Sequence, residues 1–190
     1  MKGENLHSEI SRENSSLLQD VVVANVLVGM YANCGYLERA ENVFENLTFR
    51  DVIIWTTFMG ALSKHGFCKE SLYCFDHMQI EGISPDSVTF VCILKACTNI
   101  GDIEKGQSMY SEIVKKGFDE DVVVATSLVD MYAKCSLLTT ASDVFYRILT
   151  RNIVSWNALM AGHVEHGNSE ETLLCFRYMQ EEDLAPNDVS

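Results

Sequence analysis

Polar side chains of one kind recur along this chain at regular intervals. They are Asp20, Asp51, Asp86, Asp121, Asn152 and Asn187, separated by 31, 35, 35, 31 and 35 residues. A carboxylate accepts hydrogen bonds and an amide both accepts and donates them, so each position can cap a helix or bind a polar group of a ligand. Capping alone would also admit Ser or Thr, yet all six positions hold Asp or Asn. The spacing therefore indicates structural units that each contribute one such side chain.

The residues between these positions repeat as well, at an offset of 101. The segment 21–24 returns as 122–125, and Trp55 returns as Trp156. Self-similarity at a fixed period is typical of stacked repeats. We predict five units, 21–51, 52–86, 87–121, 122–152 and 153–187. Residues 1–20 would be the second helix of an incomplete unit and 188–190 the start of another, so we expect the chain to be a fragment of a longer array.

Each unit has the pattern of a helical hairpin. In 21–51 the apolar residues Val23, Leu27 and Tyr31 follow helical spacing, and a second apolar stripe runs from residue 37 to residue 47 after a break at Gly35. Proline follows the second helix at positions 85 and 186, where it would stop that helix. We predict an all-α fold, a right-handed α-solenoid (superhelix) of helix–turn–helix repeats, stabilised by the interfaces between units.

The bulk properties narrow the class of protein. Of 190 residues, 47% are hydrophobic, and no apolar run is long enough to span a bilayer. The first twenty residues lack an apolar segment and contain three glutamates, unlike a signal or transit peptide. Seven cysteines without a CxxC pair indicate reduced, buried, intracellular thiols. The net charge of −13 disfavours nucleic-acid binding, although a solenoid can be acidic on one face only.

Several short patterns imitate catalytic or metal sites. His65 with Cys68, and Cys74 with His77, have zinc-like spacing, but the equivalents of Cys68 and His77 are Ser and Tyr. The triplet 163–165 matches half of a zinc-deaminase motif, but no P-C-x-x-C follows. Trp55 and Trp156 recur at one unit position and are expected in the hairpin core. We therefore expect no enzyme activity, no metal and no cofactor.

These residues resemble the pentatricopeptide repeat family of plants, specifically its subclass with mixed motif lengths. Residues 122–125, 131–135 and 143–145 look like the short motif of that subclass. Residues 156–162 with 184–187 look like its 35-residue motif, and 87–90 with 94–97 like its long motif. Tetratricopeptide repeats have a fixed length of about 34 residues, which the alternation of 31 and 35 does not fit.

The resemblance implies single-stranded RNA binding with one base per repeat. In the family the fifth and last residues of a unit read the base. Here these base-reading pairs are Asn25 with Asp51, Thr56 with Asp86, Val91 with Asp121, Thr126 with Asn152, and Asn157 with Asn187. By resemblance the four polar pairs favour uracil, guanine, adenine and cytosine in that order, whereas Val91 cannot form a hydrogen bond. The expected RNA is 5′-U-G-N-A-C-3′.

Two further sets of residues follow from the resemblance. The second residue of each unit, β-branched throughout, would wedge between bases, although core packing explains it equally well; these are Val22, Ile53, Val88, Val123 and Val154. Lys64 and Lys134 share one unit position and are candidate phosphate contacts, but Asn33 and Glu165 occupy that position elsewhere.

The expected function is to hold organellar transcripts, in a mitochondrion or chloroplast, for editing, splicing or processing. Other RNA-editing or processing proteins would be partners, whereas no membrane or small-molecule substrate is expected. Two alternatives stay open, an acidic α-solenoid scaffold for protein partners and a non-functional truncated remnant. A first-helix face that is as acidic as the rest of the protein, with the base-reading positions left out, would favour the scaffold.

Overall fold

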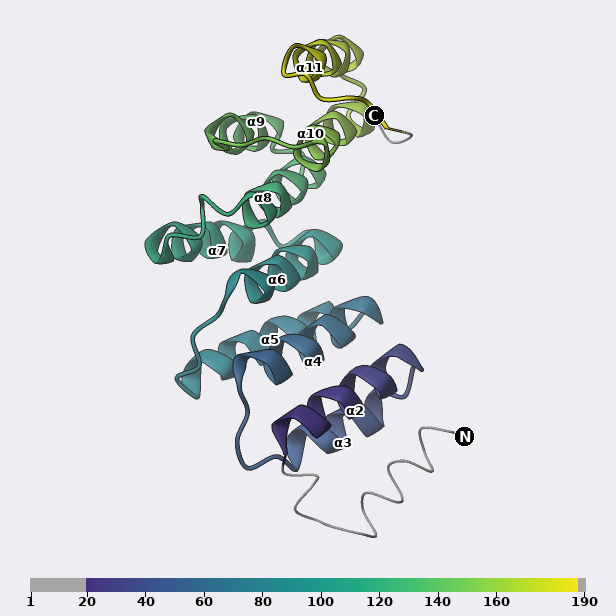
Figure 1. The fold of residues 1–190 in the computed structure, drawn as a ribbon, viewed down its shortest axis with the longest axis vertical. Helices are drawn as coiled ribbons and strands as arrows, with labels where there is room; N and C mark the ends of the chain where they lie inside the picture. Colours follow the sequence, from purple (N-terminus) through teal and green to yellow (C-terminus); the bar gives the residue numbers. More distant parts are fainter. Residues whose placement is uncertain (1–19, 188–190) are drawn as a thin grey trace. The chain divides into compact units, whose positions relative to one another are not determined.

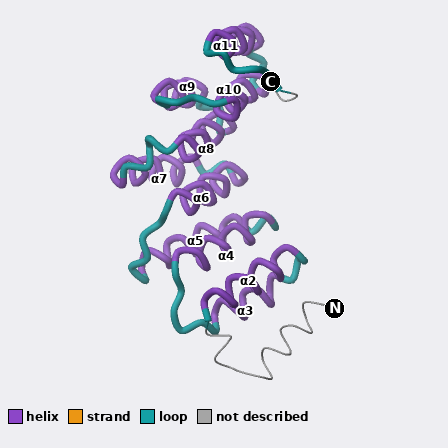
Figure 2. The backbone as a smooth tube through the Cα atoms, viewed as in Figure 1, coloured by secondary structure: helices purple, strands orange, loops and turns teal. Residues whose placement is uncertain are grey.

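The computed structural model describes residues 20–187, which form ten α-helices and no strand (Figure 1, Figure 2). Four hairpins are α2 (Val21–Asn33) with α3 (Leu37–Glu45), α4 (Val52–Lys64) with α5 (Cys68–Ile80), α8 (Val122–Lys134) with α9 (Leu138–Arg147), and α10 (Ile153–Glu165) with α11 (Ser169–Glu181). Between the second and the third of these along the chain are α6 (Ser87–Ile100) and α7 (Ile103–Lys116). The all-α prediction is confirmed. The predicted incomplete unit, apart from Asp20, and the start at 188–190 lie outside the described residues.

The chain divides into two compact units, residues 1–96 and 97–190, with the division inside α6. We call them the N-terminal and C-terminal units. In the N-terminal unit α2 packs against α3 and α4, and α4 packs against α5. In the C-terminal unit α8 packs against α7, α9 and α10, and α10 packs against α11. No helix among the described residues is long and apolar enough to cross a membrane.

The turn between the helices of a hairpin needs a left-handed backbone conformation. Gly35, Gly66 and Gly167 supply it with φ of 80°, 86° and 74°, which costs glycine no steric strain. Ser136 occupies the equivalent turn between α8 and α9 with φ 63°. Its hydroxyl lies 2.9 Å from Nε2 of His166, a contact that offsets part of the strain.

The second helices end earlier than their prolines suggest. Helix α5 ends at Ile80, and the turn that follows contains Gly82 with φ 78°. Pro85 lies further along, directly before Asp86. The prediction that proline stops this helix is therefore wrong, because the chain has already left the helix at the glycine turn. In the last hairpin α11 ends at Glu181, also before Pro186.

The core of each unit repeats one cluster of aromatic and charged side chains. In the N-terminal unit the Phe44 ring lies 4.7 Å from Trp55, edge to face, and Arg50 lies over Phe44 and pairs with Glu81 at 3.1 Å. The two tryptophans are 3% and 1% exposed, which confirms their predicted place in the core. Core burial of an aromatic ring is among the larger single contributions to a small unit.

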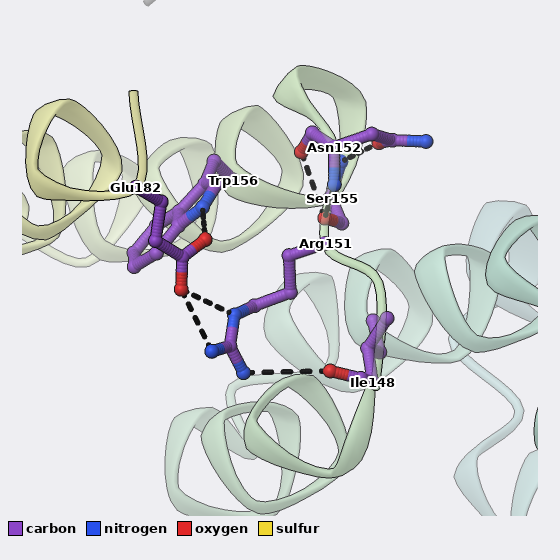
Figure 3. A network of polar contacts seen from close by, with 6 residues as sticks. All are labelled: Ile148, Arg151, Asn152, Ser155, Trp156 and Glu182. Carbon is purple, nitrogen blue, oxygen red and sulfur yellow. Dashed lines mark hydrogen bonds and ion pairs between the residues drawn. The ribbon is translucent and has the colours of Figure 1, made fainter. Parts of the chain in front are cut away.

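In the C-terminal unit the Phe145 and Trp156 rings are 4.6 Å apart and Arg151 pairs with Glu182 at 2.7 Å. Figure 3 shows Glu182 between the Arg151 guanidinium and the Trp156 indole, whose Nε1 donates to it at 3.0 Å. The 101-residue period of the sequence is therefore also a period of side-chain packing.

The seven cysteines are all free thiols. Cys68, Cys97 and Cys175 are buried, as expected, but Cys34 at the end of α2 is exposed, so the expectation of uniform burial is wrong there. Cys34 follows the last residue of α2, where the chain turns toward α3, and Cys74, Cys92 and Cys135 are only half-buried.

Candidate nucleic-acid interface

Within each unit, two first helices lie side by side and run in the same direction, α2 with α4 and α8 with α10. At the end of α4, Lys64 Nζ donates to Asn33 Oδ1 at the end of α2, at 2.9 Å. In the C-terminal unit the contact between His166 and Ser136 likewise joins the end of α10 to the end of α8. Since the ends of these paired helices meet, their starts are also neighbours. Within each unit this arrangement brings the predicted base-reading and wedge residues to one edge.

The predicted wedge residues, at the second position of each first helix, are exposed. Val22, Ile53, Val88, Val123 and Val154 are 73%, 55%, 57%, 57% and 60% exposed. At the third position, by contrast, Ile54, Thr89, Val124 and Ser155 are all at 0%. Core packing therefore does not explain the β-branched residues at the second position, because most of each side chain faces solvent.

The last residue of a unit caps the first helix of the next. The Oδ1 atom of Asp51 accepts from the Ile54 backbone N–H at 2.9 Å, and that of Asn152 accepts from the Ser155 N–H at 2.9 Å. Asp86 and Asp121 accept backbone N–H groups at 2.8 Å through the same atom. Each cap bond uses one of the two terminal atoms of the side chain. The capping interpretation is thus correct, and it leaves Oδ2 of Asp or Nδ2 of Asn for another partner.

Serine or threonine at the third position holds two of these caps more firmly. Ser155 Oγ accepts from the Asn152 backbone N–H at 3.1 Å, which completes a capping box. Thr89 Oγ1 donates to Asp86 Oδ1 at 2.7 Å. Figure 3 shows the side-chain nitrogen of Asn152 pointing away from the helix start, while its oxygen faces Ser155. Thr89 and Ser155 were not among the residues predicted from the sequence, although a hydroxyl three residues after an Asp or Asn is a recognisable capping signal.

The fifth residues lie one helical turn after the start of each first helix. In the N-terminal unit Asn25 is half-buried, and its Oδ1 is buried with no hydrogen-bond partner among the described residues. A buried amide oxygen without a partner is uncommon and costs free energy unless a ligand supplies a donor. Asn25 and its predicted partner Asp51 lie on the packed helices α2 and α4.

In the second predicted pair, Thr56 and Asp86 are connected through the side chain of Thr89. The Thr56 hydroxyl lies 2.8 Å from Thr89 Oγ1, which in turn donates to Asp86. Because the Thr89 hydrogen goes to Asp86, Thr56 donates its own hydrogen to Thr89 and keeps only acceptor capacity. The structure thus connects Thr56 to Asp86 by a chain of hydrogen bonds that fixes both side chains.

The remaining two pairs differ from each other. Asn157 Nδ2 donates directly to Asn187 Oδ1 at 3.1 Å, so the structure brings this predicted pair into contact. Thr126 instead donates to the Val122 carbonyl at 2.6 Å, one turn back on its own helix, while Asn152 caps α10. The side chains of Thr126 and Asn152 each bond to a backbone group, so the structure shows no direct bond between the members of this predicted pair.

The two predicted phosphate contacts are at the far end of the first helices from the wedge residues. Lys64 is exposed and bonded to the neutral Asn33. Lys134 is exposed but forms an ion pair with Asp130 at 2.9 Å on its own helix. The charge of Lys134 is thus partly offset, whereas that of Lys64 is not.

The acidic charge of the protein is not on the first helices. These five helices carry three lysines (Lys64, Lys95, Lys134) against two acids (Asp130, Glu165), a net charge of +1. The five second helices carry eleven acids against seven basic residues, a net charge of −4. A first-helix face as acidic as the rest would have favoured the scaffold alternative, and it is absent from the described helices. None of their His, Cys, Asp and Glu side chains forms a group of three that could hold a metal ion.

Sequence comparison places these repeats in a family. The PPR repeat matches residues 22–52, 88–118, 123–153 and 154–184, and a further PPR repeat family matches residues 50–99. This chain belongs to the pentatricopeptide repeat (PPR) family.

Similar PPR proteins are known from Arabidopsis thaliana. The pentatricopeptide repeat-containing protein At4g33990 is 36% identical over 174 residues, 91% of this chain and 21% of that protein. The chloroplastic protein At1g11290 is 34% identical over 188 residues, 99% of this chain and 23% of that protein. The chain therefore spans about a fifth to a quarter of these relatives.

Solved PPR structures share the fold. PPR10 in complex with an 18-nt psaJ RNA element matches with a TM-score of 0.77 and 18% identity, over 96% of this chain and 28% of that one. The PPR domain of Arabidopsis thaliana protein-only RNase P 1, in complex with tRNA, matches with a TM-score of 0.68 and 10% identity, over 88% of this chain and 93% of that one.

Proposed function

We propose that this PPR chain binds single-stranded RNA, with each repeat contacting one base through its fifth and last residues. One observation carries the proposal. At the start of each first helix, an exposed β-branched side chain stands beside an Asp or Asn whose cap bond occupies only Oδ1. An apolar surface for a base and a fixed polar atom for its edge are the two elements of base recognition in single strands.

The cap bond determines which bases each last residue would favour. With Oδ1 occupied, Asp51 and Asp86 present Oδ2, an acceptor, whereas Asn152 presents Nδ2, a donor. Uracil and guanine carry a ring N–H on the pairing edge, and adenine and cytosine carry a ring nitrogen that accepts. Asp therefore suits uracil or guanine, and Asn suits adenine or cytosine. Capping and base reading are compatible, because the first orients the side chain for the second.

The fifth residue would select the size of the base. Thr56 and Thr126 are short and leave room for a two-ring purine, whereas Asn25 and Asn157 extend further and reach a one-ring pyrimidine. Together with the last residues this gives uracil, guanine, any base, adenine and cytosine. The unit with Val91 supplies no hydrogen bond at its fifth position. The proposed preference is 5′-U-G-N-A-C-3′.

The first helices carry a net charge of +1, but Lys64 and Lys134 lie at the end opposite to the wedge residues, and the capping carboxylates of Asp51, Asp86 and Asp121 lie at the binding edge itself. Phosphate contacts would therefore form away from the helix starts, at the lysine end of the first helices. Lys64 is a better candidate for a phosphate contact than Lys134, because Asp130 offsets the charge of the latter. Binding by this chain alone would be weak, since stacking contributes about 1–3 kcal/mol per base and few repeats are present.

The biological setting is part of the proposal. We infer that the chain belongs to the mixed-length subclass and holds organellar transcripts for editing, splicing or processing. Chloroplastic PPR proteins among the relatives support an organelle as the location. Most of a whole relative lies outside the stretch that this chain matches, so the processing step depends on sequence beyond it.

Titration with RNA tests the proposal. We expect fluorescence anisotropy to show tighter binding of an oligonucleotide containing 5′-U-G-N-A-C-3′ than of the same bases in scrambled order, with affinity falling as salt rises. Replacing Val22, Ile53 and Val154 by serine should weaken both complexes, while the exposed Val114 and Val164, which lie away from the helix starts, provide a matched serine control. Equal affinity for the two oligonucleotides would refute the proposal.

A further inference from the structure

A cavity of about 610 Å³ lies in the N-terminal unit, away from the proposed base-reading edge. Its walls come from the second helices α3 and α5, and α4 contributes the floor through Trp55, Phe58 and Leu62. Phe67 and Tyr73 stand at its margin and are 46% and 64% exposed. A volume of this size, with aromatic walls and floor, is typical of a site that binds a small ligand or a few side chains of a partner.

The walls of this cavity are strongly acidic. Glu38, Glu41 and Glu45 line it from α3, and Glu70 from α5. None of the four has an ion-pair partner among the described residues. The one arginine of the lining, Arg50, is already bonded to Glu81 and to two backbone carbonyls. Like charges three and four residues apart on a helix destabilise it, so the fold itself gains nothing from this arrangement.

Burial and the charges of Glu41 and Glu70 raise the pKa of the Cys74 thiol in the same wall to about 11. Glu41 and Glu70 are thus close enough to this thiol in the cavity wall to act on it electrostatically.

The second copy of the hairpin pair, 101 residues later, is an internal control. The equivalents of Glu38, Glu41 and Glu45 are Thr139, Ser142 and Tyr146, and the equivalent of Phe67 is Asn168. These residues support the same pair of hairpins and the same aromatic core in the C-terminal unit. Glu38, Glu41 and Glu45 are thus not a requirement of the fold, whereas Glu70 returns as Glu171.

The two copies also differ in how they satisfy the indole N–H of the core tryptophan. Trp156 Nε1 donates to Glu182 (Figure 3), whereas Trp55 Nε1 is buried and has no hydrogen-bond partner among the described residues. Glu81, the equivalent of Glu182, is engaged with Arg50 alone. Trp55 is 3% exposed and lines the cavity together with Glu81, so an acceptor for its buried donor can come from the cavity side.

We propose that this cavity is a docking site for a basic segment of a partner protein, with Lys or Arg beside an apolar residue. The cations would lie between Glu38, Glu41 and Glu70, close to the exposed ring of Tyr73, and the apolar residue would pack on Phe58 and Leu62. A carbonyl oxygen of the segment would accept from Trp55 Nε1. RNA does not fit this site, because its phosphates would meet the glutamates. This function is additional to RNA binding and uses a different part of the unit.

A binding measurement tests the charge requirement. The probe is a short fluorescein-labelled peptide of alternating arginine and leucine, and its control has glutamate in place of arginine. We expect the basic peptide to bind the chain, and the triple variant Glu38→Gln, Glu41→Gln, Glu70→Gln to bind it about tenfold more weakly at low salt. The matched control, Glu104→Gln, Asp119→Asn, Glu120→Gln, removes the same charge from exposed positions elsewhere and should leave the affinity unchanged. Equal weakening by both variants would overturn the proposal.

A charge-reversed variant distinguishes loss of the binding site from loss of the folded state. The triple change to lysine at Glu38, Glu41 and Glu70 should lose the basic peptide and gain the acidic one, and a chain that keeps its helical circular dichroism while gaining neither peptide contradicts the site. The preference for 5′-U-G-N-A-C-3′ over scrambled RNA should persist in these variants, so failure of either proposal can be told from failure of the other.

The tryptophans give an independent readout. The chain has two, hence two indole N–H resonances in a nitrogen-15 spectrum, assigned with Trp55→Phe. On addition of the basic peptide we expect the Trp55 resonance to move downfield as it gains an acceptor, while that of Trp156 stays in place. A shift of the Trp156 resonance alone, or of neither, would refute docking in this cavity.

Discussion

Replacing Asn152 by aspartate separates base reading from helix capping. Asn152 Oδ1 accepts the Ser155 N–H at 2.9 Å, and aspartate caps a helix as well as asparagine does. The substitution therefore keeps α10 intact and changes only the outward atom, from a donor to an acceptor. The repeat that contains Thr126 should then prefer guanine over adenine. Losing a hydrogen bond to one base and gaining one to the other is worth about 1–2 kcal/mol each, or about 2–4 kcal/mol in total.

The assay is a comparison of two oligonucleotides that differ only at the fourth base of 5′-U-G-N-A-C-3′. The ratio of the two Kd values should shift by about 30- to 700-fold toward guanine. Asp121→Asn is the control, because it makes the reverse change in the unit whose fifth residue is Val91, where we expect little effect on base preference. A variant Asn152→Asp with unchanged helical content, unchanged Tm and an unchanged preference for adenine would refute the reading geometry.

Three further predictions concern stability. Ser136→Gly should raise the free energy of unfolding in urea by about 0.5–1 kcal/mol, because glycine adopts φ 63° without strain; a decrease would show that the serine side chain matters more than the backbone. Gly162→Ala should lower it by about 1–3 kcal/mol, since a Cβ there would overlap Ala133 on the neighbouring helix, and an unchanged urea midpoint would contradict this close packing. Arg151 lowers the pKa of Glu182 through their hydrogen bond, so this carboxylate stabilises the fold above about pH 4.5 and the benefit disappears as pH falls through the lowered pKa. The difference in Tm between the wild type and Glu182→Gln should therefore vanish in acid, and a constant difference would disprove the assignment.

The sequence was enough to predict the hairpins and the place of each first helix. Helical periodicity and a cap residue are local signals, and each described first helix begins directly after Asp20, Asp51, Asp86, Asp121 or Asn152. The burial of the two tryptophans followed from their recurrence in an apolar stripe. These features depend on neighbours within a few residues or on the period itself, both of which a single sequence contains.

Other features depend on which side chains meet across hairpins, and the sequence does not contain that information. The bond between Thr56 and Thr89 links residues 33 positions apart, and nothing local distinguishes Thr56 from the back-bonded Thr126. The exposure of the second-position residues was equally hidden, because valine is as common in cores as on surfaces that bind bases. The prediction that Pro85 stops α5 was wrong because the turn at Gly82 comes before the proline, after α5 has already ended.

The cavity of the N-terminal unit could not be predicted from the sequence either. Its glutamates come from two helices that the chain separates by an entire first helix, so their common lining is a property of the packed hairpins. The 101-residue period could have drawn attention to them, because Glu38, Glu41 and Glu45 are all lost in the second copy.

Because of the cap bonds, the orientation of the last residue of each unit depends on two consecutive repeats. Asp51 belongs to one hairpin by sequence, but its carboxylate is oriented by the backbone of the next helix at Ile54. Because that partner is a backbone N–H, the first helix of any following repeat supplies it, whatever its side chains. Two arrays joined directly after such an aspartate would therefore keep its orientation, and only the last repeat of an array, with no helix after it, would lack this support.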